Sequence, residues 1–240
     1  MEITRNTIVG DIVKKNFKTA RVFEKNNIDF CCGGGITLGE ACSKSNVELN
    51  ALVPELEMLV TSSDLDSKYI NGLELNELCD YIEKRHHIYV NENILFLQQK
   101  IQKLCNVHGD NHPELFEVKE LFDGAAVNLS AHMRKEELIL FPYIRKMVKI
   151  KHGNLKATDD LGGIKKTIDV MDEEHQTEGE RFEKIALLTN AFTCPPDGCN
   201  TYQVTYQTLK DFEQDLHRHI HLENNILFKK ALSLENTLIN

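Results

Sequence analysis

Residues 219–228 read HIHLENNILF, and residues 132–141 read HMRKEELILF. Each stretch has histidine at its first position, glutamate at its fifth and Ile-Leu-Phe at its last three. Helix positions four apart lie on one face, so each stretch places an imidazole and a carboxylate on its apolar side. A buried charge is unfavourable unless it is paired or binds a metal. A hydrogen-bonded His–Glu pair would explain one copy, whereas two copies favour a metal site.

Four long helical patterns follow residue 73 and predict the fold. They cover roughly 74–105, 113–149, 163–191 and 201–235, and β-strand signals are weak throughout. The connections between the patterns are of modest length, and Pro113 suits the start of a helix. We therefore expect an all-α fold with an antiparallel four-helix bundle over residues 73–240. Shorter patterns predict a small helical domain over residues 1–62, and the polar stretch at 61–72 resembles a linker.

The other two long patterns also carry histidines. His175 lies on the apolar face of the third pattern, and the first pattern contains the adjacent pair His86 and His87. Helical spacing places His86 nearer the centre of the apolar stripe and His87 nearer its edge, so either could be a ligand. Glu92 lies five residues beyond His87 and faces elsewhere. This helix therefore offers a histidine without a carboxylate partner.

The candidate ligands together number four histidines and two glutamates. Zinc usually takes four ligands, whereas six such groups suit two non-haem irons bridged by the glutamates and by an oxo or hydroxo group. A set rich in neutral imidazole leaves the metal pair more positive, which favours dioxygen, nitric oxide or anions as ligands. Glu174 and Glu178 flank His175 and either accept hydrogen bonds from imidazole N–H groups or lie in solvent.

The seven cysteines are scattered and odd in number, which favours reduced intracellular thiols over a secreted disulfide framework. Cys31 and Cys32 precede three glycines, which end a helix and permit positive φ. This thiol pair could form a vicinal disulfide, bind a metal or attack an oxidised centre. The alternative is a turn in which small residues merely fit. Cys194 and Cys199, in CPPDGC, could pair under oxidation.

Composition limits the classes of partner. The net charge of −9 argues against nucleic-acid and anionic-membrane binding. The N-terminus lacks the basic start and apolar core of a signal peptide, and no stretch approaches the roughly 18 apolar residues of a membrane span. We therefore expect a cytoplasmic protein. Surface positions are the expectation for the remaining histidines, with a supporting role near the metal as the alternative for two of them, His217 and His221.

Several motifs in order give the chain a family resemblance over essentially its whole length. They are IDFCCGGGITLGEAC, YIEKRHH, HGDNHPEL, SAHMRKEELILFP, VMDEEH and HIHLENNILF. The sequence resembles the iron-sulfur cluster repair proteins, also called the Repair of Iron Centres family. The resemblance implies a hemerythrin-like di-iron bundle behind a small helical domain with the Cys-Cys pair. It implies as metal ligands His87, His132, Glu136, His175, His219 and Glu223.

The resemblance chooses His87 over His86, because the first ligand of the family follows an arginine and usually an aromatic residue. It implies recovery of iron-sulfur proteins damaged by nitric oxide or peroxide, through iron donation or nitric oxide removal. Cys31 and Cys32 would transfer iron, electrons or nitrosyl groups, and a second copy of the chain is a further expected partner. The competing hypotheses are a hemerythrin-like carrier or sensor of dioxygen or nitric oxide, and a di-iron nitric oxide reductase.

Overall fold

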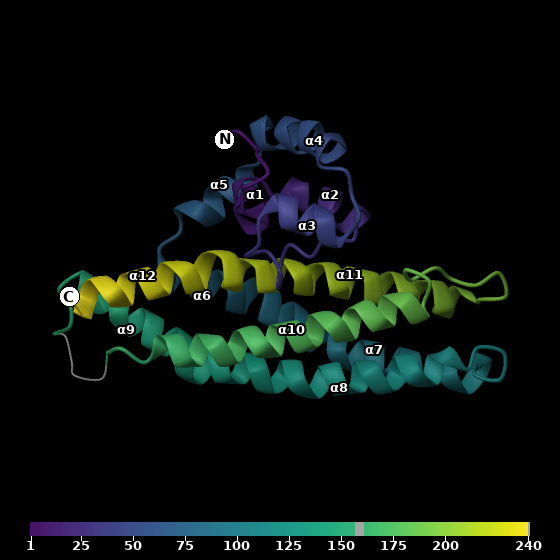
Figure 1. The fold of residues 1–240 in the computed structure, drawn as a ribbon. Helices are drawn as coiled ribbons and strands as arrows, with labels where there is room; N and C mark the ends of the chain where they lie inside the picture. Colours follow the sequence, from purple (N-terminus) through teal and green to yellow (C-terminus); the bar gives the residue numbers. More distant parts are fainter. Residues whose placement is uncertain (157–160, 240) are drawn as a thin grey trace. The chain divides into compact units, whose positions relative to one another are not determined.

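The computed structural model describes residues 1–156 and 161–239 (Figure 1). Within these residues no β-strand forms, apart from an isolated bridge between Ile8 and Thr37. The prediction of an all-α fold is therefore confirmed. No helix in the same ranges has the length and apolar character needed to cross a bilayer. The chain divides into two compact units, Met1–Cys79 with Ile144–Lys165 and Ile220–Asn240, and Asp80–Tyr143 with Lys166–His219.

Long helices build the second unit. They are α7 (Ile88–His108), α8 (Glu114–Lys135), most of α10 (Ile164–Leu188) and most of α11 (Asn200–Leu222) (Figure 1). Helix α7 contacts α8 through Gln98 and Asp123, α8 contacts α10 through Asn128 and Glu178, and α10 contacts α11 through Phe182 and Phe212. These contacts confirm the predicted helical bundle. Its helices begin and end within a few residues of the patterns in the sequence.

A cluster of aromatic side chains forms one part of the bundle core. Phe122, Phe182 and Phe212 are fully buried, with ring centroids 5.6 Å apart for both Phe122–Phe212 and Phe182–Phe212. Tyr202 and Tyr206 are also buried, and their hydroxyls lie 3.1 Å apart. Burial of each such ring stabilises the fold by about 1.5 to 3 kcal/mol. This apolar packing holds the helices together so that other positions can carry buried polar groups.

Within residues 1–156 and 161–239, three π-helical turns interrupt otherwise regular helices. They are η2 (Glu83–His87) between α6 (Leu75–Ile82) and α7, η3 (Glu136–Leu140) between α8 and α9 (Phe141–Lys151), and η4 (Glu223–Leu227) between α11 and α12 (Phe228–Ile239). In η3, for example, the Phe141 N–H bonds to the Glu136 carbonyl five residues earlier. A π turn inserts an extra residue into the helix and is frequent at functional sites. Each turn here contains or begins with an expected metal ligand.

Short helices form most of the first unit. They are α1 (Val9–Lys15), η1 (Phe17–Thr19), α2 (Ala20–Lys25), α3 (Leu38–Lys44), α4 (Leu49–Thr61) and α5 (Leu65–Gly72). Helix α5 occupies the stretch that resembled a linker, so that expectation is wrong for residues 65–72. Ser67 and Ile70 are buried, and Ser67 Oγ accepts a hydrogen bond of 2.9 Å from the Phe17 N–H. The domain boundaries at 1–62 and 73–240 stay a prediction.

The segment that carries Cys31 is fastened to η4 within the first unit. Asn225 Nδ2 donates to the carbonyls of Phe30 and Cys31, at 3.4 and 3.2 Å. The ring of His221 packs against Phe17 and Phe30, with centroids 6.0 Å apart in both pairs. His221 is only 1% exposed, so the expected surface position is wrong for this histidine. Its place is in the core of the first unit.

The glycine run after the cysteines permits close backbone approach rather than positive φ. None of Gly33, Gly34 and Gly35 has a positive φ. A Cβ on Gly34 would lie 2.2 Å from the Phe30 carbonyl oxygen and 3.2 Å from Asn225 Nδ2. Any side chain at this position would therefore push the cysteine turn away from η4.

Gly10 gives a direct test of this packing. A Cβ at Gly10 would lie 2.2 Å from Asn225 Oδ1 and 3.0 Å from the Gly34 carbonyl oxygen. We expect Gly10→Ala to displace Asn225 and to lower the free energy of unfolding by about 1 to 3 kcal/mol, as overpacking usually does. Urea unfolding measures the change. The matched control is Gly72→Ala, where nothing lies within 4 Å, and equal stability of the two variants would contradict the packing argument.

Candidate metal centre

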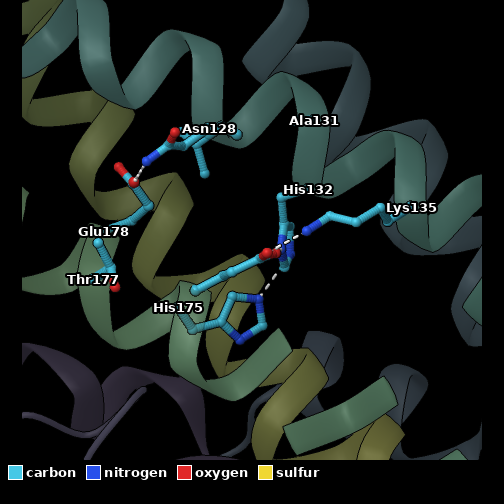
Figure 2. A pocket seen from close by; sticks show the side chains of 9 residues that line it. Asn128, Ala131, His132, Lys135, His175, Thr177 and Glu178 are labelled. Carbon is cyan, nitrogen blue, oxygen red and sulfur yellow. Dashed lines mark hydrogen bonds and ion pairs between the residues drawn. The ribbon is translucent and has the colours of Figure 1, made fainter. Parts of the chain in front are cut away.

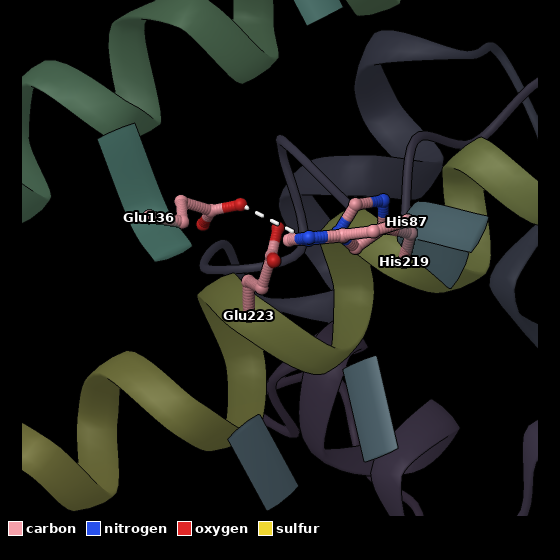
Figure 3. Close-up of side chains that lie close together, drawn as sticks. All are labelled: His87, Glu136, His219 and Glu223. Carbon is pink, nitrogen blue, oxygen red and sulfur yellow. Dashed lines mark ion pairs between the residues drawn. The ribbon is translucent and has the colours of Figure 1, made fainter. Parts of the chain in front are cut away.

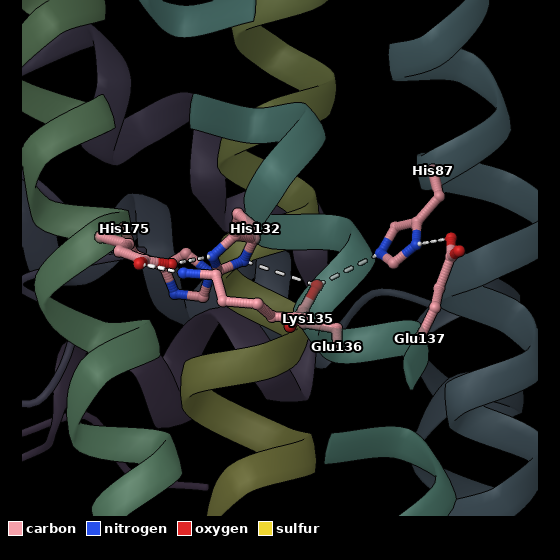
Figure 4. Close-up of polar contacts among 7 residues, drawn as sticks. His87, His132, Lys135, Glu136, Glu137 and His175 are labelled. Atoms are coloured by element: carbon pink, nitrogen blue, oxygen red, sulfur yellow. Dashed lines mark hydrogen bonds and ion pairs between the residues drawn. The ribbon is translucent and has the colours of Figure 1, made fainter. Parts of the chain in front are cut away.

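Five of the expected ligands lie in the second unit and point toward one another (Figures 3 and 4). His87 ends η2, His132 lies in the last turn of α8, Glu136 begins η3, and α10 and α11 carry His175 and His219. Each of these side chains is at most 4% exposed. The structure therefore brings polar groups from separate helices into one buried region.

The distances within this region are those of ligands around metal ions. His132 Nε2 and His175 Nε2 are 2.9 Å apart. Glu136 Oε2 lies 3.4 Å from His132 Nε2 and 3.4 Å from His87 Nε2. Neighbouring ligands bound to one ion at about 2.1 Å are separated by about 3 Å. The ring of His219 lies 5.0 Å from that of His87, so the imidazoles form two pairs with one carboxylate between them.

The sixth expected ligand, Glu223, follows His219 by four residues. The helix continues from α11 into η4 with helical backbone angles, so both side chains lie on one face. Glu223 is fully buried. Within the second unit, potential ligand atoms within 4.8 Å of one another form two groups: His87, Glu136 and His219 (Figure 3), and His132, Glu136 and His175. Each group has two imidazoles of its own, and the Glu136 carboxylate belongs to both.

The Glu136 carboxylate has the surroundings of a metal ligand. It is completely buried, and among the described residues neither oxygen accepts a hydrogen bond of good geometry. A buried carboxylate in that state destabilises a protein by about 1 to 3 kcal/mol or more. Coordination to two cations would satisfy both oxygens. The donor set of imidazole nitrogen and carboxylate oxygen is one that iron accepts.

Carboxylates outside this group orient two of the imidazoles (Figure 4). His87 Nδ1 donates to Glu137 Oε1 and His132 Nδ1 donates to Glu174 Oε2, both at 2.8 Å. Lys135 Nζ also donates to Glu174. With the proton held on Nδ1, each Nε2 presents its lone pair to the centre, which is the usual arrangement for metal-binding histidines.

Hydrogen bonds from His132 and Lys135 keep the Glu174 carboxylate ionised. The hydrogen bond from His132 and then the one from Lys135 lower the pKa of Glu174 to about 2, although partial burial opposes them. Glu174 is therefore an imidazole acceptor, the first of the two expectations for it. Glu178 is different: it is 3% exposed but bonds to Asn128 and Arg181 instead of an imidazole.

His86 is buried beside the metal-binding groups but belongs to neither. Its Nδ1 lies 3.0 Å from Asp215 Oδ2, and its ring stacks on that of His219 at 5.4 Å. Burial lowers the pKa of His86, although Asp215 opposes this effect. His87 thus lies in one of the groups, whereas His86 packs against His219. The choice of His87 as the ligand stays a prediction.

A pocket of about 240 Å³ opens beside one imidazole pair (Figure 2). Its lining consists of Asn128, Leu129, Ala131, His132, Lys135, Glu174, His175, Thr177 and Glu178. Since a water occupies about 30 Å³, the pocket has room for several small molecules. The charge of Lys135 on this side is paired with Glu174. A small neutral ligand could therefore approach His132 and His175 from the pocket.

The Cys31-Cys32 pair lies in the first unit, in a turn built by Asp29. The carboxylate of Asp29 accepts hydrogen bonds from the N–H groups of Cys31, Cys32 and Gly33, at 2.9, 3.0 and 2.6 Å. The two sulfurs are 3.7 Å apart, and both side chains are in the thiol form. The hydrogen bond with Cys32, together with burial, raises the pKa of the Cys31 thiol well above its ordinary value. Cys31 is therefore the protonated, sheltered thiol, and Cys32 is the more accessible one.

Glu174→Ala tests the orientation of His132. Loss of the carboxylate leaves Nδ1 of this histidine without its acceptor, so we expect iron affinity to fall by about 10- to 100-fold, as other changes of this kind do. Competition with a chelator of known affinity gives the measurement. Glu173→Ala, which changes an exposed neighbouring carboxylate, is the control. Equal affinity of both variants would refute a role for Glu174.

Two segments of the chain each match a known protein family. Residues 5–60 match the ScdA N-terminal domain, described as a domain of unknown function, and residues 80–231 match the hemerythrin HHE cation binding domain. The chain is 32% identical over 233 residues to the iron-sulfur cluster repair protein ScdA of Staphylococcus epidermidis, covering 95% of this chain and 99% of that protein.

Two relatives from other bacteria carry a related name. The chain is 31% identical to the iron-sulfur cluster repair protein YtfE of Yersinia pseudotuberculosis and 32% identical to that of Musicola paradisiaca. Each comparison covers 95% of this chain and 97% of the relative. With its ligand motifs and its cysteine turn in the matching domains, the chain belongs to the ScdA and YtfE family of iron-sulfur cluster repair proteins.

Proposed function

We propose that this protein holds two non-haem irons and restores iron-sulfur clusters damaged by nitrosative or oxidative stress. The position of Glu136 carries the proposal, since one of its oxygens lies 3.4 Å from an imidazole of each group. A carboxylate in that place can bridge two ions. The names of the relatives state iron-sulfur cluster repair, and the hemerythrin domain supports iron as the metal.

The ions would be held by six residues, His87, His132, Glu136, His175, His219 and Glu223. Iron at this site would supply one-electron chemistry and an affinity for small ligands such as nitric oxide or dioxygen. Glu174 and Glu137 keep the imidazoles aligned, and Lys135 keeps Glu174 ionised. Glu136 is the residue whose movement or protonation would loosen an ion, because its carboxylate is shared and no described side chain donates a hydrogen bond to it.

The Cys31-Cys32 pair would carry out the transfer step of the repair. Asn225, in η4, holds the carbonyl of Cys31, and η4 begins at Glu223. A shift of this π turn would therefore move both Glu223, an expected metal ligand, and the cysteine turn. We propose that Cys31 and Cys32 pass iron, electrons or nitrosyl groups to or from a damaged iron-sulfur protein.

An isotope experiment tests the proposal and separates its two forms. The protein is loaded with isotopically labelled iron and mixed anaerobically with a purified iron-sulfur enzyme inactivated by nitric oxide. Donation predicts recovered activity with labelled iron in the client, whereas nitric oxide removal predicts recovery without label. Absence of recovery by the iron-loaded protein would contradict cluster repair.

A second function is favoured by the pocket beside His132 and His175. Its 240 Å³ would admit dioxygen or nitric oxide, as a carrier, a sensor or a nitric oxide reductase requires. Repeated turnover of nitric oxide to nitrous oxide by the reduced protein would support the reductase. A single turnover per site would count against it.

Expected partners under the repair proposal are damaged iron-sulfur proteins in the cytoplasm.

A further inference from the structure

A second cluster of reactive side chains lies in the bundle unit, where the loop before α11 meets the end of α7. It consists of His108, His112, Cys194, Asp197 and Cys199. Among the described residues, no group of potential metal ligands includes any of them. The proposed iron chemistry therefore leaves these residues unused. Two cysteines and a histidine close together are the components of a reactive thiol site.

Cys199 has the surroundings of a nucleophile. It is exposed, and its carbonyl accepts the first bond of α11 from the Gln203 N–H at 3.1 Å. The side chain thus lies at the positive end of a long helix. His108 Nε2 is 3.4 Å from Cys199 Sγ. The hydrogen bond from His108, followed by the Tyr202 N–H, lowers the pKa of the Cys199 thiol to about 7.

The histidine is held in place by aromatic packing. Its ring lies edge-on to Tyr202, with centroids 5.3 Å apart, and 6.5 Å from the ring of His112. Tyr202 is completely buried. His108 therefore has a fixed position from which to stabilise the thiolate of Cys199.

His112 ties the loop to the helix ends around it. His112 Nε2 lies 3.0 Å from Asp197 Oδ1, and His112 Nδ1 lies 3.0 Å from Glu114 Oε1. Although burial lowers it, the pKa of His112 is raised overall by these two carboxylates. Asp197 is two residues before Cys199, so this ion pair fixes the part of the loop that presents the thiol.

Cys194 is the second thiol of the same turn. Gly198 N–H bonds to the Pro195 carbonyl at 2.9 Å, which closes the chain between the two cysteines. A Cβ on Gly198 would lie only 2.4 Å from Cys194 Sγ, so this sulfur rests against the residue next to Cys199. Burial, followed by the neighbouring Cys199, raises the pKa of the Cys194 thiol. One thiol of the pair is activated and the other is kept protonated.

We propose that Cys199 is a peroxide-reactive nucleophile and that Cys194 is its resolving thiol. The Cys199 thiolate attacks one oxygen of a hydroperoxide, the O–O bond breaks, and hydroxide or alkoxide leaves. Cys199 becomes a sulfenic acid. Cys194 then loses its proton and attacks that sulfur, an S–S bond forms and water leaves. The two thiols are oxidised by two electrons in total, and the peroxide is reduced.

His108 is a positioning residue in this scheme, and its role has a separate readout. The rate of Cys199 alkylation by iodoacetamide is measured against pH on the full, iron-loaded chain. We expect a midpoint near the value of about 7 that the structure gives. In His108→Gln the midpoint should rise toward the ordinary thiol value of about 8.5, with a roughly tenfold slower reaction at neutral pH. An unchanged pH profile would overturn the role of His108.

Site-resolved mass spectrometry tests the oxidation itself, with hydrogen peroxide as the probe. Cys194 and Cys199 fall in one tryptic peptide, residues 185–210. We expect the treated wild type to lose two hydrogen atoms from this peptide, Cys194→Ser to accumulate a dimedone-reactive sulfenic acid at Cys199, and Cys199→Ser to do neither. Oxidation of other cysteines with this peptide unchanged would overturn the proposal, as would a sulfenic acid at Cys194 in Cys199→Ser.

Discussion

We expect replacement of Glu136 with alanine to remove both of the proposed irons rather than one. Its Oε2 lies at the same distance, 3.4 Å, from His87 Nε2 and from His132 Nε2, and it belongs to both groups of ligand atoms. If each group holds one ion, each ion loses a ligand in the variant, and a cavity replaces the carboxylate between them. We expect iron content to fall to a small fraction of the wild-type value when the chelator concentration and pH are the same.

Unfolding measurements give the same prediction a second readout. A ligand at about a thousand times its dissociation constant stabilises the native state by about 4 kcal/mol. Iron should therefore raise the free energy of unfolding of the wild type by an amount of this order, and raise that of Glu136→Ala little. Glu173→Ala, at an exposed site, should behave like the wild type. Retention of one tightly bound iron in Glu136→Ala would show that the carboxylate serves only one ion.

We expect replacement of both Cys31 and Cys32 with serine to slow cluster recovery strongly while the metal centre stays loaded. Serine keeps the size and the backbone N–H groups of the turn, so the hydrogen bonds to Asp29 remain. It lacks the thiolate that acts as nucleophile and metal ligand, so we expect recovery of the nitric oxide-damaged client to slow by about tenfold or more. Iron content and nitric oxide binding should be unchanged.

This variant also separates repair from gas carriage. A carrier or sensor needs only the metal centre, so the double variant would keep its full function under that hypothesis. Cys199→Ser controls for the loss of a reactive thiol elsewhere and should recover the client at the wild-type rate. Full recovery by Cys31→Ser/Cys32→Ser would remove the thiol pair from the proposed mechanism.

The bundle could be predicted from the sequence because its core positions repeat at helical spacing. The pattern places two His–Glu pairs on apolar helix faces, His132 with Glu136 and His219 with Glu223. It predicted correctly that these four side chains are buried. Spacing could not choose between His86 and His87, because it assumes a constant 3.6 residues per turn. The π turn η2 adds a residue over Glu83–His87, which brings both histidines into the interior at 1% exposure each.

Other features depend on contacts between distant segments. Glu137 and Asp215, which bond to His87 and His86, carry no local signal that distinguishes them from surface carboxylates. His221 is off the metal-binding face of its helix, yet it is buried because Phe17 and Phe30 cover it. The polar stretch at 65–72 forms a helix whose Ser67 and Ile70 are buried, and Ser67 bonds to the distant Phe17 N–H. None of these pairings can be read from periodicity along one helix.

Metal content combined with Mössbauer spectroscopy of anaerobically purified protein tests the central claim most directly. If Glu136 bridges two ions, the wild type contains two irons per chain with the spectrum of a coupled pair, and Glu136→Ala loses that spectrum. One zinc per chain, no metal, or two magnetically independent irons would contradict the shared carboxylate.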